Sequence, residues 1–250
     1  MLSVIFMTPY VLVMFQLLYD VPVKNVFTDR LIDTAIGSAI AFIANFLLVP
    51  VWEHEQISGY MIKAIETNIA YFKKVAAAFT GEQVLVTDYK ISRKDAFVAL
   101  ANLSDALTRM LNEPKRVQKN SSLVHQFVVY NHQLTSHIAT LSYYAQEFAA
   151  RSTTKEFMPV IEHIVATLLS IESILKGETA DASANPAPYW QTIDKRVTVL
   201  MEKRRKELKE GLTDTDTRIS LQASKSVTDQ FKVIYDLVTD IKKVSAQLAL

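Results

Sequence analysis

The chain has 250 residues, half of them hydrophobic, with 27 lysines and arginines against 26 aspartates and glutamates and no cysteine. A net charge of +1 gives no electrostatic reason to expect nucleic acid as a partner, and the lack of cysteine excludes disulfides and thiolate metal sites. The charges are unevenly distributed, because residues 1–52 hold five of them and the other 198 residues hold 48. A region of that second length can bury its own hydrophobic core.

Two apolar runs fill the charge-poor region. Residues 1–19 (MLSVIFMTPYVLVMFQLLY) carry no charged side chain, and residues 31–52 (LIDTAIGSAIAFIANFLLVPVW) carry only Asp33. About 20 helical residues span roughly 30 Å, the thickness of bilayer hydrocarbon. A backbone in lipid must also satisfy its own hydrogen bonds, which favours helices. We therefore predict two transmembrane helices, joined by residues 20–30 into an antiparallel hairpin.

The alternative for residues 1–19 is a cleaved signal peptide. Such a peptide has a basic start and a small-residue cleavage site, and this run has neither. A retained span is therefore favoured, and Pro9 in its middle is expected to kink the helix. Because the chain begins inside this apolar run, we expect it to be the C-terminal portion of a longer membrane protein.

The second apolar run contains small residues at a spacing that suits close helix packing. They are Ala35, Gly37, Ser38, Ala39, Ala41 and Ala44. A spacing of four places Gly37 and Ala41 on one stripe, where another helix can approach closely. The alternative is that small residues are simply common in membrane helices. Pro50 and Trp52 mark the predicted exit from the membrane, since tryptophan favours the headgroup layer.

Arg30 and Asp33 lie one helical turn apart at the start of this run, so they can pair on one face. A carboxylate at a membrane boundary is a functional candidate, and the alternative is an ion pair that only sets the depth of the helix. The flanking charges hardly distinguish the two orientations. The large cysteine-free region after residue 52 favours a cytoplasmic location for residues 53–250 of a multi-pass membrane protein.

Residues 53–250 read as one all-helical domain. Breaks are predicted at residues 79–88, 113–121, 151–154, 177–188 and 211–216. Apolar residues between the breaks recur every three or four positions, on seams that begin at Phe127, Phe157 and Val227. Such seams are typical of long helices packed at shallow angles. The fold class predicted is therefore all-α: a two-helix membrane hairpin followed by an elongated antiparallel bundle of five or six helices.

Motifs for catalysis or for cofactor binding are missing from the sequence. The five histidines show no metal-binding spacing, and no phosphate-binding glycine loop or nucleophile elbow occurs. Glu53-His54-Glu55 suggests a metal cluster, but adjacent helical residues point apart. The histidines are better explained as hydrogen-bonded bundle residues. We predict no enzyme activity, no catalytic residue, no metal and no cofactor.

Residues 195–209 (KRVTVLMEKRRKELK) form a basic run with Glu202 and Glu207 interleaved. Glu202–Lys206 and Lys203–Glu207 are four apart, a spacing that allows ion pairs along a solvated helix face. Contact with anionic headgroups or with a partner domain is the alternative. Aromatic residues are absent from the run, which argues against nucleic acid.

Two strings resemble the fusaric acid resistance (FUSC) family, which includes YccS- and YhfK-like inner-membrane proteins related to aromatic acid exporters. The first string runs from Arg30, Asp33, Thr34 and Gly37 to Pro50 and Trp52 and resembles the last membrane helix of that family. The second, residues 99–114, resembles its soluble helical region and ends in Glu113-Pro114. This resemblance implies a six-helix membrane bundle followed by a cytoplasmic helical domain. Because the chain has two predicted spans, it would be a fragment or would assemble with further helices.

The leading hypothesis is therefore a component of a FUSC-like inner-membrane transporter that exports aromatic or other organic acids. Its expected partners are the lipid bilayer, further transmembrane helices of the same family and an organic-acid substrate, and no nucleic acid. Its candidate residues for transport or membrane packing are Arg30, Asp33, Thr34, Gly37, Ala41, Pro50 and Trp52, with Glu113 and Pro114 as family-like positions in the soluble domain. The competing hypothesis is a membrane-anchored helical scaffold that does not transport.

Overall fold

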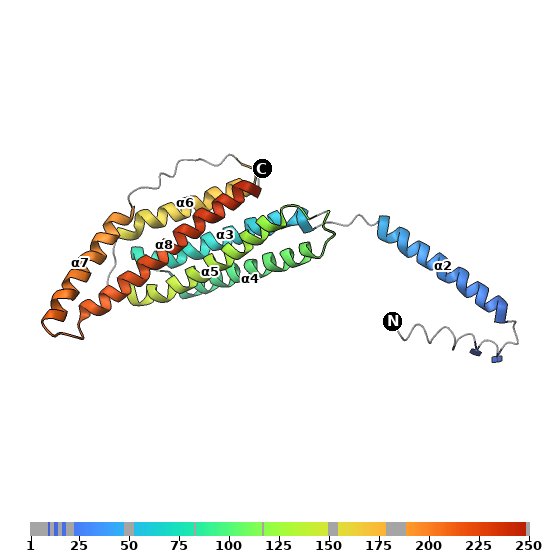
Figure 1. Cartoon of the computed structure of the whole chain (residues 1–250), viewed down its shortest axis with the longest axis horizontal. Coiled ribbons are helices and arrows are strands. Elements are labelled where there is room, and N and C mark those ends of the chain that lie inside the picture. The colour runs from blue at the N-terminus through green and yellow to red at the C-terminus, as the bar shows by residue number, and fades with distance from the viewer. Residues whose placement is uncertain are drawn as a thin grey trace. The chain divides into compact units, whose positions relative to one another are not determined.

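The computed structural model divides into two compact units, residues 1–51 and residues 52–250 (Figure 1). The residues that the structure describes are 10, 13–14, 17–18, 23–47, 53–82, 84–116, 118–149, 155–178 and 189–248. All of the regular structure in these ranges is helical, and no strand occurs in them, which confirms the predicted all-α class.

The first unit contains one long helix, α2 (Val23–Leu47). It begins eight residues before the predicted second span, because residues 23–30 (VKNVFTDR) contain no glycine or proline that would stop a helix. Most of the predicted first span and the end of the second lie outside the described residues, although Tyr10, Leu17 and Leu18 are helical and exposed. The two-span hairpin therefore stays a prediction.

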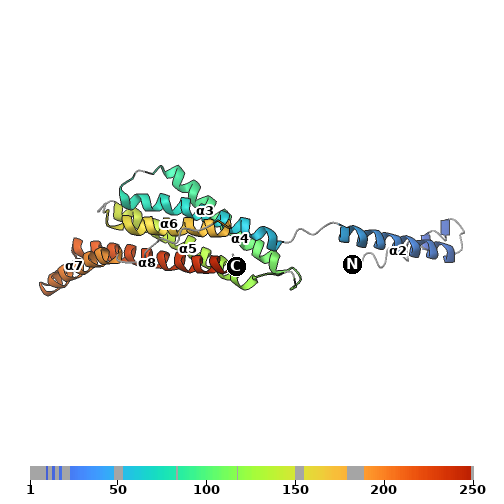
Figure 2. The ribbon, with the colours of Figure 1, turned by 90° about the horizontal axis from the view of Figure 1, so that it is seen from above.

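Six α-helices make up the described part of the second unit (Figures 1 and 2). They are α3 (Glu53–Thr80), α4 (Val86–Leu111), α5 (Ser121–Ala149), α6 (Met158–Leu175), α7 (Tyr189–Lys209) and α8 (Asp216–Leu248). A single 3₁₀ turn, η1 (Lys155–Phe157), precedes α6. The connections agree with all five predicted breaks to within three residues. The expected bundle of long helices is therefore confirmed.

The core of this unit lies along the predicted apolar seams. On α5, Phe127, Leu134 and Ile138 are fully buried, and α6 and α8 bury Ile164 and Ile234 in the same way. Apolar burial of this kind is the main force that holds helices together in a bundle, at roughly 25 cal/mol per Å² of surface removed from water. The seams were predicted from spacing alone, and the structure confirms them.

Four phenylalanines join the helices near the middle of this core. The ring of Phe231 on α8 stacks on Phe157 at 5.0 Å between centroids and meets Phe79 edge-on at 5.4 Å. Phe72 lies two helical turns before Phe79 on α3 and also meets Phe231 edge-on, at 6.4 Å between centroids. Offset and edge-to-face contacts are the favourable geometries for aromatic pairs. They fix α3, η1 and α8 against one another.

A polar cluster crosses the core between α3 and α5. Thr135 donates a hydrogen bond to the side-chain oxygen of Asn68 at 3.0 Å, and Asn68 donates to Asn131 at 3.4 Å. The amide of Asn131 donates to the Phe127 carbonyl oxygen at 2.9 Å. All three side chains are at most 1% exposed. Because these groups find partners only when the two helices are in this register, the cluster specifies their alignment.

Among the described residues, α6 is the one helix that is long and apolar enough to cross a membrane by length and composition. It packs against α3 and α8, and Val160, Ile164 and Leu168 belong to the core. Its apolarity is therefore explained by its place in the bundle.

Candidate functional site

The predicted membrane residues share α2. Arg30, Asp33, Thr34 and Gly37 are all exposed, and Thr34 donates a hydrogen bond to the Arg30 carbonyl oxygen at 2.7 Å. In the part of the chain that the structure describes, Arg30 and Asp33 form no ion pair. Pro50 and Trp52 lie outside the described residues.

The small-residue face of α2 is open. A methyl group added at Gly37 would meet no atom within 4 Å, and Ala41 is also exposed. Its packing against another helix remains a prediction.

Large apolar side chains cover the side of α2 that lies away from Gly37 and Ala41. Exposed fractions lie between 49% and 70% for Leu31, Ile32, Ile36, Ile40, Phe42 and Ile43. A helix that exposes so many large apolar side chains needs an apolar environment, either a protein core or lipid. The first unit provides no core around the described part of α2, since every described α2 side chain is exposed.

Glu113 and Pro114 belong to the connection between α4 and α5. The amide of Glu113 donates to the Met110 carbonyl oxygen at 3.2 Å, which continues the last turn of α4. The side chain of Gln118 donates to the carbonyl oxygens of Leu111 and Glu113 at 2.9 and 2.7 Å. Pro114 is exposed. These two family-like positions therefore shape a turn.

Of the described histidines, His137 and His163 have structural environments, whereas His125 and His132, which were also expected to be hydrogen-bonded in the bundle, are exposed. His137 lies 2.9 Å from the side-chain oxygen of Gln230, and the ring of His163 stacks on Tyr235 at 5.2 Å between centroids. Burial, with help from the charge of Lys242, lowers the pKa of His163 below its ordinary value. Within the described ranges, no group of three or more histidines and acidic residues could hold a metal ion. The side chains of Glu53, His54 and Glu55 are not among those that the structure describes.

The basic run lies on α7, which packs mainly against α8 and projects with the start of α8 beyond the other helices (Figures 1 and 2). Glu207 pairs with Arg204 at 3.4 Å, whereas the predicted pairs of Glu207 with Lys203 and of Glu202 with Lys206 are not formed. Arg204 faces the α7–α8 turn and donates to the carbonyl oxygens of Leu212 and Thr213 at 3.0 and 2.8 Å. Because these bonds hold Arg204 at the turn, Arg204 is the ion-pair partner of Glu207.

Glu207 also accepts hydrogen bonds from Thr215 at 2.6 Å and from Thr217 at 2.5 Å. These bonds favour the ionised carboxylate and lower the pKa of Glu207 below its ordinary value. Along the outer face of α7, Lys203, Lys206 and Lys209 are exposed, as expected for a solvated face.

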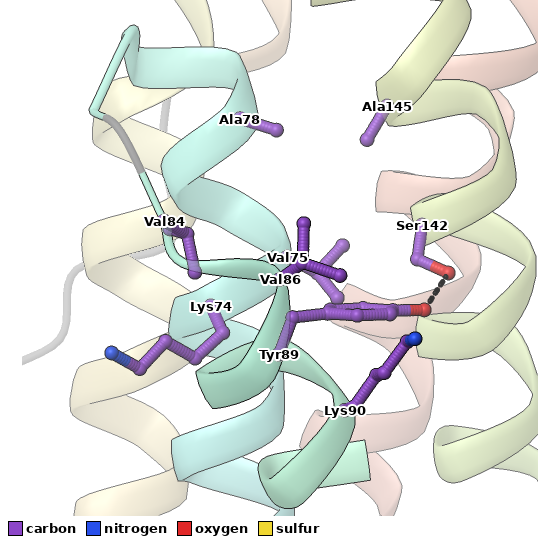
Figure 3. A pocket seen from close by; sticks show the side chains of 9 residues that line it. All are labelled: Lys74, Val75, Ala78, Val84, Val86, Tyr89, Lys90, Ser142 and Ala145. Atoms are coloured by element: carbon purple, nitrogen blue, oxygen red, sulfur yellow. Dashed lines mark hydrogen bonds between the residues drawn. The ribbon is translucent and has the colours of Figure 1, made fainter.

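A cavity with a volume of about 350 Å³ lies between α3, α4 and α5 (Figure 3). Its walls are mainly apolar and are formed by Val75, Ala78, Val84, Val86 and Ala145. Tyr89, Ser142, Lys74 and Lys90 supply the polar groups. Ligand sites commonly combine apolar walls with a few polar groups in this way, at volumes from roughly 300 Å³ upwards.

Tyr89 reaches from α4 to α5, where its hydroxyl lies 2.9 Å from that of Ser142 (Figure 3). Beside this pair, the ring of Tyr71 lies 5.9 Å from that of Tyr89 and is fully buried. Burial raises the pKa of the Tyr71 hydroxyl well above its ordinary value, and the neighbouring Tyr89 acts in the same direction. Tyr71 is therefore a neutral phenol at any physiological pH.

This cavity was not predictable from the spacing of residues along the chain. Its lining comes from three helices and from the connection at residues 81–85, and these segments meet only in the folded bundle. One sequence signal was present: Val84, Leu85 and Val86 are three consecutive apolar residues inside a predicted break, and Leu85 and Val86 are 72% and 66% exposed.

Comparisons with known proteins show similarity to one inner membrane protein and to two uncharacterized proteins. An uncharacterized protein of Haemophilus influenzae is 28% identical over 149 residues, which are 58% of this chain and 21% of that protein. Inner membrane protein YccS of Escherichia coli is 28% identical over 179 residues, 72% of this chain and 24% of YccS. The uncharacterized protein ORF2 of Neisseria gonorrhoeae is 28% identical over 162 residues, 64% of this chain and 36% of ORF2.

No family model matches the chain, and no solved structure matches it. The matched region covers about a fifth to a third of the length of each relative. An identity of 28% over 72% of the chain supports the predicted resemblance to YccS-like proteins. The chain is similar, over most of its length, to an inner membrane protein.

Proposed function

We propose that this chain is part of a bacterial inner-membrane transporter of the FUSC type, which exports aromatic or other organic acids. In this proposal, residues 1–52 form a two-span hairpin that packs against further membrane helices, and residues 53–250 form a cytoplasmic bundle. The chain is not an enzyme. The observation that carries the proposal is that α2 exposes all of its described side chains, many of them large and apolar, in a chain similar to YccS over 72% of its residues.

Asp33 and Gly37 have distinct roles in this proposal. Asp33 is the single carboxylate within the second apolar run, so it can interact with a transported ion or substrate at the membrane boundary. Gly37 allows a neighbouring helix to approach the α2 backbone.

Efflux measurements in the complete protein test these roles. We expect Asp33→Asn and Gly37→Leu each to reduce export of a labelled aromatic acid from loaded cells at equal protein levels. The matched control is Asp29→Asn, one turn earlier and outside the apolar run, which should leave export unchanged. If both substitutions leave export at the wild-type rate, the proposed role of the hairpin fails.

A membrane-anchored scaffold is the second candidate function. The projecting α7–α8 end favours it, because Val199, Met201 and Leu208 are 64%, 50% and 53% exposed there beside exposed lysines. Replacing residues 1–52 with an unrelated hairpin of equal length separates the two functions. A scaffold still binds its soluble partner through the bundle after this exchange, whereas a transporter loses export.

A further inference from the structure

We propose that the cavity between α3, α4 and α5 is a binding site for a small organic anion, with a compact apolar body and a single carboxylate or similar group. This site lies in the helical bundle, apart from the predicted membrane spans. It does not depend on whether the chain takes part in export.

The walls of the cavity suit the apolar body of such a ligand. Small side chains leave the space open, since Ala78 and Ala145 stand where longer residues would fill it. The ring of Tyr89 forms one side (Figure 3), and a flat face of this kind favours contact with a planar or aliphatic group. A volume of about 350 Å³ is large enough for a ligand of about ten non-hydrogen atoms together with water bound to that ligand.

The charge at the cavity comes from Lys90. The ammonium group of Lys74 is paired with Asp88 at 3.4 Å and points away from Ser142 in Figure 3, so Lys74 contributes mainly its aliphatic stem to the lining. Lys90 forms no ion pair with any residue that the structure describes, and its side chain extends toward the side of the cavity that holds Tyr89 and Ser142 (Figure 3). A cation without a partner beside apolar walls favours an anionic ligand.

The hydroxyl pair positions the aromatic wall of the cavity. Ser142 donates to the Ala139 carbonyl oxygen at 2.7 Å, so the 2.9 Å bond between the two hydroxyls is donated by Tyr89. This bond holds the ring of Tyr89 in place as a wall of the cavity. The ammonium group of Lys90 would then bind the anionic group.

Equilibrium dialysis of radiolabelled benzoate against the full chain in lipid nanodiscs tests the proposal, with empty nanodiscs as the blank. We expect saturable binding to the wild-type chain and about tenfold weaker binding to Lys90→Gln, because a hydrogen bond to a charged group contributes roughly 1.5 kcal/mol. Lys94→Gln, an exposed lysine on the same helix, is the matched control and should bind as wild type. Unlabelled benzyl alcohol, which has the same ring without the charge, should compete poorly.

A second pair of variants tests the cavity itself. Ala78→Leu fills the space and should abolish binding, whereas Ala101→Leu adds the same volume at an exposed position of α4 and should not. The proposal is overturned if benzoate binds only as it does to empty nanodiscs, or if Lys90→Gln and Ala78→Leu both bind as wild type. Competition by benzyl alcohol as strong as that by benzoate would also overturn it. Since no transport is measured, failure here and failure of the export proposal are distinguishable.

Discussion

Asn131 is a polar residue at the centre of an otherwise apolar helix face. Its side chain links Asn68 on α3 to the backbone of α5, and Thr135 completes the cluster. Buried polar groups of this kind contribute little net stability when they are paired, but they are costly to leave unpaired. This asymmetry determines what a substitution does.

We predict that Asn131→Ala lowers the free energy of unfolding by about 2 kcal/mol, because it leaves the Asn68 amide without its acceptor and opens a small cavity. In circular dichroism of the full chain in mild detergent, the expected decrease in Tm is roughly 4–8 °C. Asn102→Ala, at an exposed α4 position, is the control and should change Tm by no more than about 2 °C. Equal Tm values for the two variants would show that the cluster does not specify the packing of α3 on α5.

At the scale of residues, the sequence predicts which side chains are buried better than it predicts which polar groups bond to one another. The position of Asn131 in the α5 seam follows from spacing, and its burial is confirmed. Its partner Asn68 does not follow, because 63 residues separate the two in the chain. The contact of Tyr89 on α4 with Ser142 on α5, at the cavity, likewise does not follow from the sequence. Contacts between helices depend on their rotation and register, which periodicity does not determine.

Glycines end three of the helices of the bundle. Gly81, Gly177 and Gly211 all have positive φ, and each stands just after α3, α6 or α7. In each case the next amide donates back to a carbonyl oxygen of the last turn, as Glu178 does to Ser173 at 2.9 Å. This is the Schellman arrangement, which a residue with a side chain adopts only at a cost.

We predict opposite effects for alanine at two glycines. Gly177 has φ +76° and open space around it, so Gly177→Ala should cost about 1 kcal/mol through the backbone alone and lower Tm by roughly 2–4 °C. Gly59 lies within α3 in equally open space, so Gly59→Ala should raise Tm by about 1–3 °C through higher helix propensity. Shifts of the same sign in both variants would contradict this account of the helix end.

At the scale of helices, glycine and proline made the boundaries predictable. Gly81, Gly177 and Gly211 all fall in predicted breaks, and Pro159 stands in the first turn of α6, where proline is tolerated. The ion pairs of α7 were less predictable. Arg204 turns toward the carbonyl oxygens of Leu212 and Thr213, and this contact with the following turn outweighs the pairing expected from a spacing of four.

At the scale of the whole chain, the two units differ in how they satisfy their apolar residues. The second unit buries its seams, with Phe72, Leu134 and Ile234 fully inaccessible to solvent. The described side chains of α2 are all exposed, and they include Leu31, Ile36 and Ile40. Such a helix is stable in lipid or in contact with other apolar helices. We therefore propose that the first unit lies in the membrane and tethers the bundle.

Alkaline carbonate extraction of membranes from cells that produce the full chain tests this claim most directly. Carbonate releases proteins that are held at a membrane surface by charge, whereas lipid-embedded helices stay in the pellet. We expect the chain to remain in the carbonate pellet and to enter the supernatant only with detergent. Recovery of the folded chain in the carbonate supernatant, without detergent, would contradict it.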